Sequence, residues 1–535
     1  MKLFDKFYLN VGVKALIALC FVYSFMIFSF IWGNHDWLYL KDKISYSENW
    51  FEARLTIHFF NLLFAEGLVL PVFTIVFGVL GIVILGIVVA NYLEIPKTKF
   101  NYMSILLLIG MFPYNFVVFY YLYTVIALYW WAVFGVALLF LAEGKIKNWK
   151  IAVGGIGYFL LLGSYPPNYS FVLCVFVCRK IFDYVFKGKS VEDILKSCLF
   201  LCGQILIGFI GFKLLLMMTN FEEGMIYNVR VLGVQDIILR IPIEIVRGFS
   251  AIYYLQDELG WSGVCFLMFL ICVGGFIVFE KAKNKFVALV MMLALLLCSR
   301  FMFLVASEAD VAYFRGGYWG ILGIVVFGVG VFCFEHKMWR RNVIFVFECV
   351  FLMIFIVTDF EIQKTRKLMF DAEIKFMERV KNRIERVESF DYKNNYTSLI
   401  VGKTSFWEHF CFEGCKGYNN EILSSIYLSG DFISLLFFDD EIYPVTFKLG
   451  WWDSRVWKIQ DGRFLKFNGF GQAVSKDEAL KIMSWAYKNV KKWPNVDSLY
   501  IDKKRIFMMF DGGMDNIYVL TPLLINVLND GMSFE

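Results

Sequence analysis

The sequence of 535 residues contains little charge. Asp, Glu, Lys and Arg make up 19% of it, whereas 59% of the residues are hydrophobic and the mean hydropathy is +0.62. A soluble domain of this size carries more charge and alternates it along every element. Here the charge lies in short clusters between apolar runs of about 18–22 residues, long enough to cross a bilayer core of roughly 30 Å. This pattern excludes a soluble globular chain and predicts a mainly α-helical, polytopic membrane protein.

Several motifs are also absent. The sequence has no GxxxxGK[ST] phosphate-binding loop and no dinucleotide-binding fingerprint. No nucleic-acid-binding module is visible, so nucleic acid is not an expected partner. No small-x-small cleavage site follows the first apolar run, which is therefore interpreted as a membrane helix and not as a signal peptide. The two halves show no inverted repeat, and this disfavours the transporters that are built from such repeats.

The apolar runs predict about eleven transmembrane helices. They cover residues 11–32, 67–91, 102–118, 119–141, 151–165, 169–186, 197–218, 259–280, 286–306, 317–335 and 342–359. Basic clusters occupy every second loop, which places those loops and the N-terminus in the cytoplasm and the C-terminal part outside. The stretch 241–257 is a further candidate for a segment that enters the membrane, so the count stays open.

Three regions follow from this pattern. Residues 1–360 form a transmembrane domain with a first outer loop at 33–66, residues 361–390 an amphipathic helical connector, and residues 391–535 a small extracytoplasmic α/β or α+β domain. In that last region TSLIVG, ISLLFF, VDSLYI and RIFMMF are predicted strands. Cys411 and Cys415 form either a disulfide or a free pair, and a zinc site is not expected because a second pair is missing.

The first outer loop carries the strongest candidates for chemistry. Asp36 directly follows the first apolar run between Trp32 and Trp37, where partial burial would raise the pKa of its carboxyl group. Farther along, Arg54 and His58 share one face of a predicted interfacial helix. The alternative is that charged residues near a helix end simply lie in water.

Three segments resemble the GT-C glycosyltransferases, and among them the bacterial type II glucosyl transferases that modify O-antigen. They are HDW with FEAR in the first loop, GSYPPNYS at 163–170 and AYFRGGYWGILG at 312–323. The resemblance covers residues 1–340 and departs at His35-Asp36, where relatives carry an acidic pair. It implies inverting transfer of a sugar, glucose in those relatives, from a polyprenyl-phosphate donor. The acceptor would be a lipid-linked glycan or O-antigen-like molecule on the outer face of a bacterial inner membrane.

This reaction assigns roles to particular residues. A carboxylate must accept the proton of the attacking hydroxyl, and Asp36 is the expected base. Guanidinium groups match the geometry of the departing phosphate. The expected donor-phosphate ligands are Arg54 and Arg315, with Lys213, Arg247 and Arg230 as further candidates. The expected supporting or acceptor-binding residues are His35, Glu52, His58 and Tyr165.

Each assignment has a plainer alternative. Arg315 and Lys213 lie near predicted span ends, where long basic side chains extend to the headgroups without any catalytic role. Tyr165 fits an interfacial aromatic belt. Arg240, Glu244 and Arg247 lie on an amphipathic stretch that either covers the lipid donor or presents a solvated face. No cofactor or metal site is expected, although a divalent cation near the acidic residues of the first loop stays open.

Two other functions compete with sugar transfer: a flippase or transporter for a lipid-linked oligosaccharide, and a polymerase of such units. A transport pathway would place charges in the middle of several spans. The predicted spans are nearly uncharged, with Lys213 and Arg300 as the notable exceptions. The aromatic content of 19% is ascribed to contact with membrane lipids.

Overall fold

The computed structural model describes most of the N-terminal two thirds of the chain and short pieces of the remainder. The described residues are 5–29, 56–68, 70–113, 115, 122–144, 147–164, 167–218, 234–254, 256–301, 304, 315–334, 338–388, 397–401, 456–460, 463–466, 499–501, 505–509 and 518–520. The chain divides into two compact units. The first holds Met1–Phe30, Asp42–Glu223 and Asn228–Lys364, and the second holds Ile31–Lys41, Gly224–Tyr227 and Thr365–Glu535.

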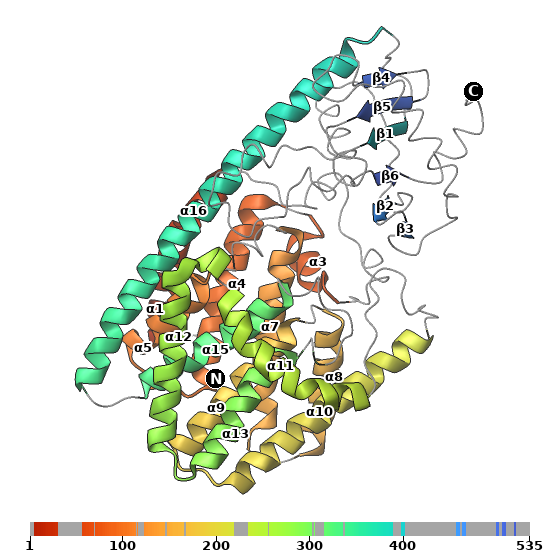
Figure 1. The fold of residues 1–535 in the computed structure, drawn as a ribbon. Coiled ribbons are helices and arrows are strands. Elements are labelled where there is room, and N and C mark those ends of the chain that lie inside the picture. Colours follow the sequence, from red (N-terminus) through yellow and green to blue (C-terminus); the bar gives the residue numbers. More distant parts are fainter. Residues whose placement is uncertain are drawn as a thin grey trace. The chain divides into compact units, whose positions relative to one another are not determined.

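The first unit is a bundle of helices (Figure 1). Their bounds are α1 Lys6–Val22, α2 Ser24–Ser29, α3 Phe59–Ala65, α4 Pro71–Tyr92, α5 Lys99–Gly110, α7 Leu122–Leu139, the 3-10 helix η3 Phe140–Ala142, α8 Asn148–Leu162, α9 Pro167–Val185, α10 Val191–Met218, α11 Val234–Tyr254, α12 Gln256–Lys281, α13 Lys285–Ser299, α15 Arg315–Cys333 and α16 Met338–Glu385. A helix therefore lies at each predicted apolar run. Within the first unit α16 extends as far as Lys364.

Local sequence signals explain several helix ends. Asp5, Thr98 and Asn284 are N-caps whose side chains accept hydrogen bonds from backbone N–H groups of the first turn. Pro71 occupies the first position of α4, where its missing N–H has no intrahelical partner to lose. Beyond α4, Glu94 adopts a left-handed backbone conformation with φ 52° and turns the chain.

Four helices are long and apolar enough to cross a membrane by length and composition. They are Pro71–Tyr92, Val125–Ala142, Val191–Leu215 and Gly263–Lys281. Shorter apolar helices occupy Lys99–Gly110, Asn148–Leu162, Lys285–Ser299 and Trp319–Cys333. Among the described residues these long apolar helices agree with a membrane protein. The count of about eleven spans stays a prediction.

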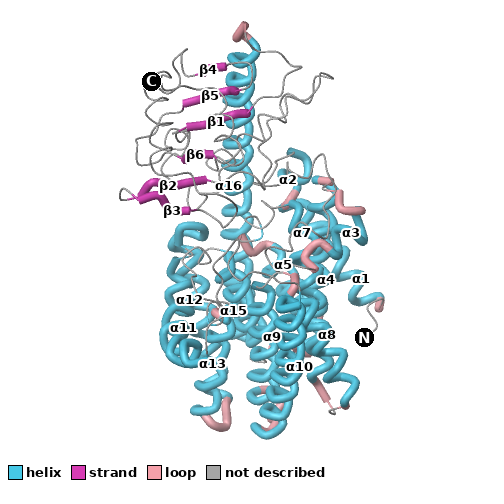
Figure 2. The backbone as a smooth tube through the Cα atoms, turned by 90° about the vertical axis from the view of Figure 1, so that its right-hand side faces the viewer, coloured by secondary structure: helices cyan, strands magenta, loops and turns pink. Residues whose placement is uncertain are grey.

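The helices pack closely where glycine faces a neighbour. In Figure 2, α9, α13 and α15 run alongside one another, and each pair among these three helices is in contact. A Cβ atom on Gly320 of α15 would lie 1.9 Å from the backbone oxygen of Ser299 at the end of α13. A Cβ atom on Gly208 of α10 would lie 2.7 Å from the backbone nitrogen of Phe159 in α8. Only glycine permits these backbone approaches, which is how small residues support helix packing in membranes.

A break separates α1 from α2 at Tyr23, and α16 spans it. The amide of Gln363 accepts a hydrogen bond from the Met26 N–H at 3.2 Å and donates one to the Val22 carbonyl at 2.9 Å. Gln363 is fully buried. Backbone groups released by a helix break within a membrane must find partners in the protein, and this side chain supplies them.

The second unit contains short strands in two sheets. In one sheet β1 Thr397–Val401 pairs in parallel with β5 Arg505–Met509, and β4 Leu499–Ile501 pairs antiparallel with β5. In the other, β2 Val456–Gln460 pairs antiparallel with β3 Arg463–Lys466 and with β6 Tyr518–Leu520. Three of the four predicted strands coincide with β1, β4 and β5, and the fourth, at 433–438, lies outside the described residues. Residues 361–385 of the predicted connector are helical as part of α16.

Candidate functional site

Most of the residues that sequence analysis singled out lie outside the described part of the chain. These are His35, Asp36, Glu52, Arg54, Tyr165 and Arg230. Cys411 and Cys415 lie outside it too. Arg315 is the first residue of α15, and the structure gives its backbone position. His58, Lys213 and Arg247 are described with their side chains, so the candidate site is built from them and from the helix ends around them.

The end of the predicted first outer loop is fixed to the bundle at Thr56. Its N–H donates to the Gly163 carbonyl at 2.7 Å, and its hydroxyl donates to the Leu160 carbonyl at 2.6 Å. The indole N–H of Trp131 in α7 donates to the Thr56 carbonyl at 3.0 Å. All three bonds use backbone groups of a turn that would otherwise lack partners. They bring the first loop to the start of the GSYPPNYS segment.

His58 lies one turn farther along and is buried, with 2% of its surface exposed. It caps the N-terminus of α3, whose Phe60 packs edge-to-face against Trp131 at 5.1 Å between ring centroids. His58 thus lies in the interior beside this aromatic pair in sequence, and not on a solvated helix face. That His58 shares a face of an interfacial helix with Arg54 stays a prediction, since Arg54 lies outside the described residues.

The second and third resemblance segments meet at the same end of the bundle, where α8 and α13 finish and α7, α9 and α15 begin. Trp319 is 1% exposed, and its ring packs against Phe171 of α9 at 5.4 Å and against Tyr129 of α7 at 5.7 Å. Tyr169 of α9 stacks on Phe301, just beyond α13, at 6.3 Å. We call this region the site end. Stacked and tilted rings of this kind form a rigid wall.

Arg300, which ends α13, carries the main charge at the site end. Its Nε lies 3.1 Å from Oε2 of Glu244 in α11, and the two side chains are 2% and 1% exposed. Oε1 of Glu244 accepts a hydrogen bond of 2.9 Å from Nη1 of Arg247. We call Glu244, Arg247 and Arg300 the Glu244 cluster. A Cβ atom on Gly248 would lie 3.3 Å from the Leu296 backbone oxygen, so glycine lets α11 approach α13 here.

Helix α11 presents opposite characters on its two sides. The buried side carries Glu244, whereas large apolar side chains on the other side are 50–72% exposed. They are Ile238, Leu239, Ile243 and Val246. Such an amphipathic helix favours contact with lipid along its exposed side. Arg247 lies between the two environments, with 43% of its side chain exposed, so its guanidinium is accessible to a ligand that approaches along the lipid-facing side.

Lys213 lies outside the Glu244 cluster. It belongs to α10, five residues before the end of that helix, and its side chain is exposed. This placement fits the plainer alternative, in which a lysine near a span end extends along the helix toward the headgroups. Of the described candidates, Arg247 is the one that belongs to the Glu244 cluster.

The Glu244 cluster can bind an anion. A guanidinium offers paired donors that match phosphate geometry, and burial makes each such bond stronger than it would be in water. Glu244 holds Arg300 and Arg247 in position from opposite oxygens of one carboxylate. Among the described residues no group of three or more His, Cys, Asp or Glu side chains could hold a metal ion. The acidic residues of the first loop lie outside that search, so a divalent cation there stays open.

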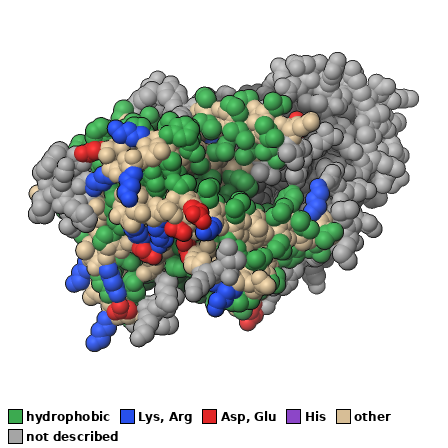
Figure 3. All heavy atoms as spheres, turned by 90° about the horizontal axis from the view of Figure 1, so that it is seen from below, with side chains coloured by type: hydrophobic (Ala, Val, Ile, Leu, Met, Phe, Trp, Pro, Cys, Tyr) green, Lys and Arg blue, Asp and Glu red, His purple; other side chains and the backbone are tan. Residues whose placement is uncertain are grey.

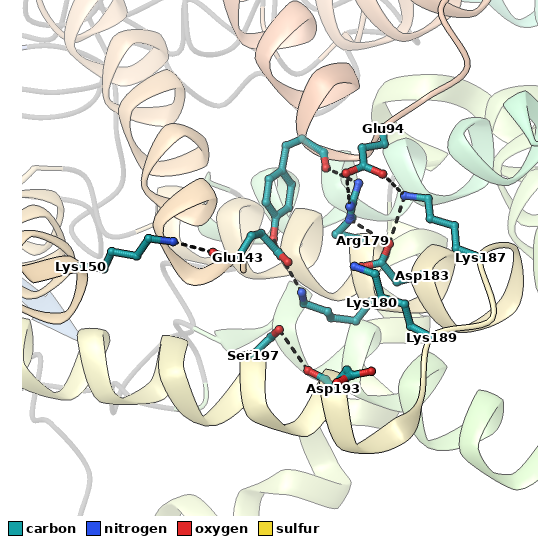
Figure 4. A network of polar contacts seen from close by, with 11 residues as sticks. Glu94, Glu143, Lys150, Arg179, Lys180, Asp183, Lys187, Lys189, Asp193 and Ser197 are labelled. Atoms are coloured by element: carbon teal, nitrogen blue, oxygen red, sulfur yellow. Dashed lines mark hydrogen bonds and ion pairs between the residues drawn. The ribbon is translucent and has the colours of Figure 1, made fainter. Parts of the chain in front are cut away.

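A second ionic network occupies the opposite end of the bundle, where α4, α7 and α9 finish (Figure 4). We call it the Glu94 network. It comprises Glu94, Glu143, Arg179, Lys180, Asp183, Lys187 and Lys189. The fully buried carboxylate of Asp183 contacts Arg179 at 3.0 Å, Lys187 at 3.1 Å and Lys189 at 2.7 Å. This network ties the helix termini of α4 and α9 together.

Glu94 is the most exposed member of this network, with a side chain that is 58% exposed. Partial burial opposes its ionisation, but hydrogen bonds from Arg179 and Lys187 outweigh this and lower the pKa of Glu94 to about 2. On the face seen from below in Figure 3, Lys and Arg side chains lie together with Asp and Glu beside a hydrophobic area. Mixed charge at helix ends is what a membrane–water boundary favours.

No family model, curated protein or solved structure matches the chain. The assignment of function therefore depends on the residues themselves. Sequence analysis identified Arg300 as a charged residue in a span and Glu244 as a member of an amphipathic stretch, but it did not predict that they pair. One signal was available: an arginine at the end of an apolar run needs a carboxylate partner, and a glutamate two helices earlier is flanked by apolar residues.

Proposed function

We propose that the chain is a membrane glycosyltransferase that moves a sugar from a polyprenyl-phosphate donor to a lipid-linked glycan or O-antigen-like acceptor. The observation that supports it is the convergence at the site end. Thr56 from the first loop bonds to Gly163, and Trp319 packs against Phe171. Thr56 follows FEAR by two residues, and described residues of the second and third resemblance segments lie in the same region of the bundle, next to the Glu244 cluster.

In this proposal the donor lies along the apolar side of α11 with its phosphate at Arg247. A polyprenyl chain matches the exposed row of aliphatic side chains on that helix. Arg247, Arg54 and Arg315 stabilise the negative charge that develops on the phosphate as the glycosidic bond breaks. Asp36 accepts the proton of the attacking hydroxyl, and the sugar configuration inverts in one displacement. His35, Glu52, His58 and Tyr165 support the loop or bind the acceptor, and Lys213 is the most peripheral of the candidates.

The proposal also includes the protein's location, its orientation in the membrane and its donor sugar. The protein resides in a bacterial inner membrane with its N-terminus in the cytoplasm. Residues 391–535 lie on the outer face, and the resemblance to type II glucosyl transferases makes glucose the first donor sugar to test. Positive charge in alternate loops supports this orientation. The donor, the acceptor and membrane lipids are the proposed partners.

The test is transfer of labelled sugar by the full-length protein in nanodiscs, supplied with synthetic polyprenyl-phosphate donors, with and without chelator. Asp36→Asn is expected to reduce the turnover rate by about 10²–10⁴-fold, because it removes the base. Arg247→Ala is expected to weaken transfer with a rise in KM for the donor. Lys196→Ala is the matched control, since Lys196 pairs with Glu192 on the exposed surface of α10. Full activity of both site variants would refute the site, and a chelator effect would place a cation in it.

A second candidate function is a flippase or transporter of a lipid-linked oligosaccharide, and one contact favours it. Glu348 of α16 is 5% exposed and accepts a hydrogen bond of 2.8 Å from the Ser104 hydroxyl of α5. A buried carboxyl group in a predicted span is a feature of transport pathways. If folded native protein transfers no sugar from any donor but moves the lipid-linked substrate across the bilayer, this second function replaces the first. Ladder-like lengthening of the product would instead indicate a polymerase.

A further inference from the structure

Asp359 of α16 is a fully buried acid that contributes no side-chain hydrogen bond to the described fold. Its exposed fraction is 0%, and both carboxyl oxygens lack a hydrogen-bond partner in the described part of the chain. It lies on the buried side of α16, in line with Phe351, Phe355 and Gln363 at intervals of four residues. Burying an ionisable residue in such a position costs folding free energy, so the residue is a functional candidate by default.

The polar groups around this part of α16 are occupied with one another. The Tyr23 hydroxyl donates to the Gly110 carbonyl at 2.8 Å, and the Tyr129 hydroxyl donates to Oδ1 of Asn115 at 2.8 Å. The Asn115 amide donates to the Ile109 carbonyl at 2.7 Å and to that of Gly110. These donors therefore leave no hydrogen bond for Asp359.

The Gln363 amide, one turn along α16, already forms hydrogen bonds with the backbone at the break between α1 and α2. Among the described residues, the titratable groups that face this region from other elements are the phenol of Tyr23 and, beside it, that of Tyr129, and neither supplies positive charge. On α16 itself, Glu361 and Lys364 lie on the exposed side. A carboxylate at this position would thus have neither a cation nor a donor in the described structure, and burying such a charge is far more costly than burying a neutral acid.

We propose that Asp359 is a proton-binding site of the membrane domain. In the described conformation its carboxyl group holds the proton. When the bundle opens and water reaches the carboxyl group, the O–H bond breaks and the proton passes to water, leaving a hydrated carboxylate; closure requires that the proton return. This inference does not depend on the proposed transferase function, because it concerns a group outside the Glu244 cluster. Because opening releases the Asp359 proton to water, opening of this part of the bundle becomes more favourable as the pH rises.

The test uses dicyclohexylcarbodiimide, an apolar reagent. The O–H of a protonated carboxyl group adds across a C=N bond of this reagent, and the adduct rearranges to a stable acylurea. The full-length protein in nanodiscs is treated over a range of pH, digested and analysed by mass spectrometry. Asp359 is expected to carry the adduct at neutral pH, with a yield that falls as the pH rises. Glu361 is the matched control, since it lies two residues away on the exposed side of the same helix and is expected to stay unmodified at neutral pH.

A second measurement separates a neutral acid from a hidden ion pair. Asp359→Asn replaces the acid by an uncharged group of the same size, so the Tm is expected to stay the same or to rise, and the adduct at position 359 is expected to disappear. A fall in Tm of several degrees would reveal a charge paired with a cation and overturn the proposal. Absence of the adduct on native Asp359 at every pH, or a yield independent of pH, would overturn it as well.

Discussion

The two ends of the bundle hold buried charge in different ways. At the Glu94 network, Asp183 contacts three cations, and the outer members of the network, such as Glu94 and Lys189, are well exposed. At the site end, Glu244 and Arg300 are almost completely buried, and a single carboxylate holds two guanidinium groups. The first arrangement extends from the interior into water through several charged side chains, whereas the second buries its carboxylate and one guanidinium and leaves only Arg247 partly exposed.

This difference separates an anchoring role from a binding role. A network that shares its charges among many partners tolerates the loss of an outer member, because water replaces it. Burying a carboxylate and a guanidinium as deeply as Glu244 and Arg300 has a high desolvation cost, and such a cost is retained where a site needs fixed charge. The number of charges at a helix end is thus a poor guide to function, and the environment of each charge is a better one.

Neutralising one glutamate at each end is expected to show the largest difference between the two ends. Glu244→Gln is expected to destabilise the protein by about 3–5 kcal/mol, because it removes the buried carboxylate that contacts both Arg300 and Arg247. Glu94→Gln removes an exposed partner and is expected to cost less than about 1 kcal/mol. Unfolding of both variants in the same detergent, followed by tryptophan fluorescence, measures the difference. Equal losses of stability would mean that the two ends do not differ in the way proposed.

A substitution at a helix contact tests how closely the helices pack at the site end. Gly320→Ala would place a Cβ atom 1.9 Å from the Ser299 backbone oxygen and force α15 away from α13. The expected loss is about 1–3 kcal/mol, the usual cost of overpacking. Gly203→Ala on α10 is the control, since no atom lies within 4 Å of its Cβ position, and it is expected to gain up to about 1 kcal/mol. A Gly320→Ala protein as stable as the control would contradict the close approach of these helices.

The smallest effect concerns pH at the network end. Because the pKa of Glu94 is lowered to about 2 from an ordinary value of 4.5, its ion pairs stabilise the fold fully above about pH 4.5. This contribution is expected to fade as the pH falls from there through about 2, where the folded-state carboxylate is protonated. The measurement is the difference in Tm between native protein and Glu94→Gln across the acidic range. A difference that vanishes well above pH 4.5 would count against the ion pairs.

Sequence patterns located the helices well but not the contacts between them. Each predicted apolar run contains a helix because its length and composition leave few alternatives in a membrane. The break at Tyr23 was not predicted, since nothing in VYSFM interrupts the apolar run and the partner, Gln363, lies 341 residues beyond Val22. Long-range pairing of this kind depends on how the helices pack, which a single sequence does not specify.

Sequence analysis named the three residues of the Glu244 cluster but not the contacts between them. Charge within an apolar run identified Arg300, and amphipathic spacing identified α11, but the bond between Arg300 and Glu244 joins residues 56 positions apart. Asp359 was overlooked because it falls at the last position of the predicted span 342–359, where a carboxylate normally meets water. Burial by α16 packing, and not by sequence context, makes it unusual. The roles assigned to Asp36 and Arg54 stay predictions.

The bridge from Gln363 to the α1–α2 break has a consequence for how the protein is made. The backbone groups at Val22 and Met26 emerge early from the ribosome, but the amide that satisfies them arrives 337–341 residues later. At about 5–20 residues per second, that delay is roughly 20–70 seconds. During this time the N-terminal helix pair is inserted yet incomplete, and it depends on lipid, water or an insertion chaperone for temporary partners. α16, the last helix of the described bundle, therefore completes the hydrogen bonding of the first.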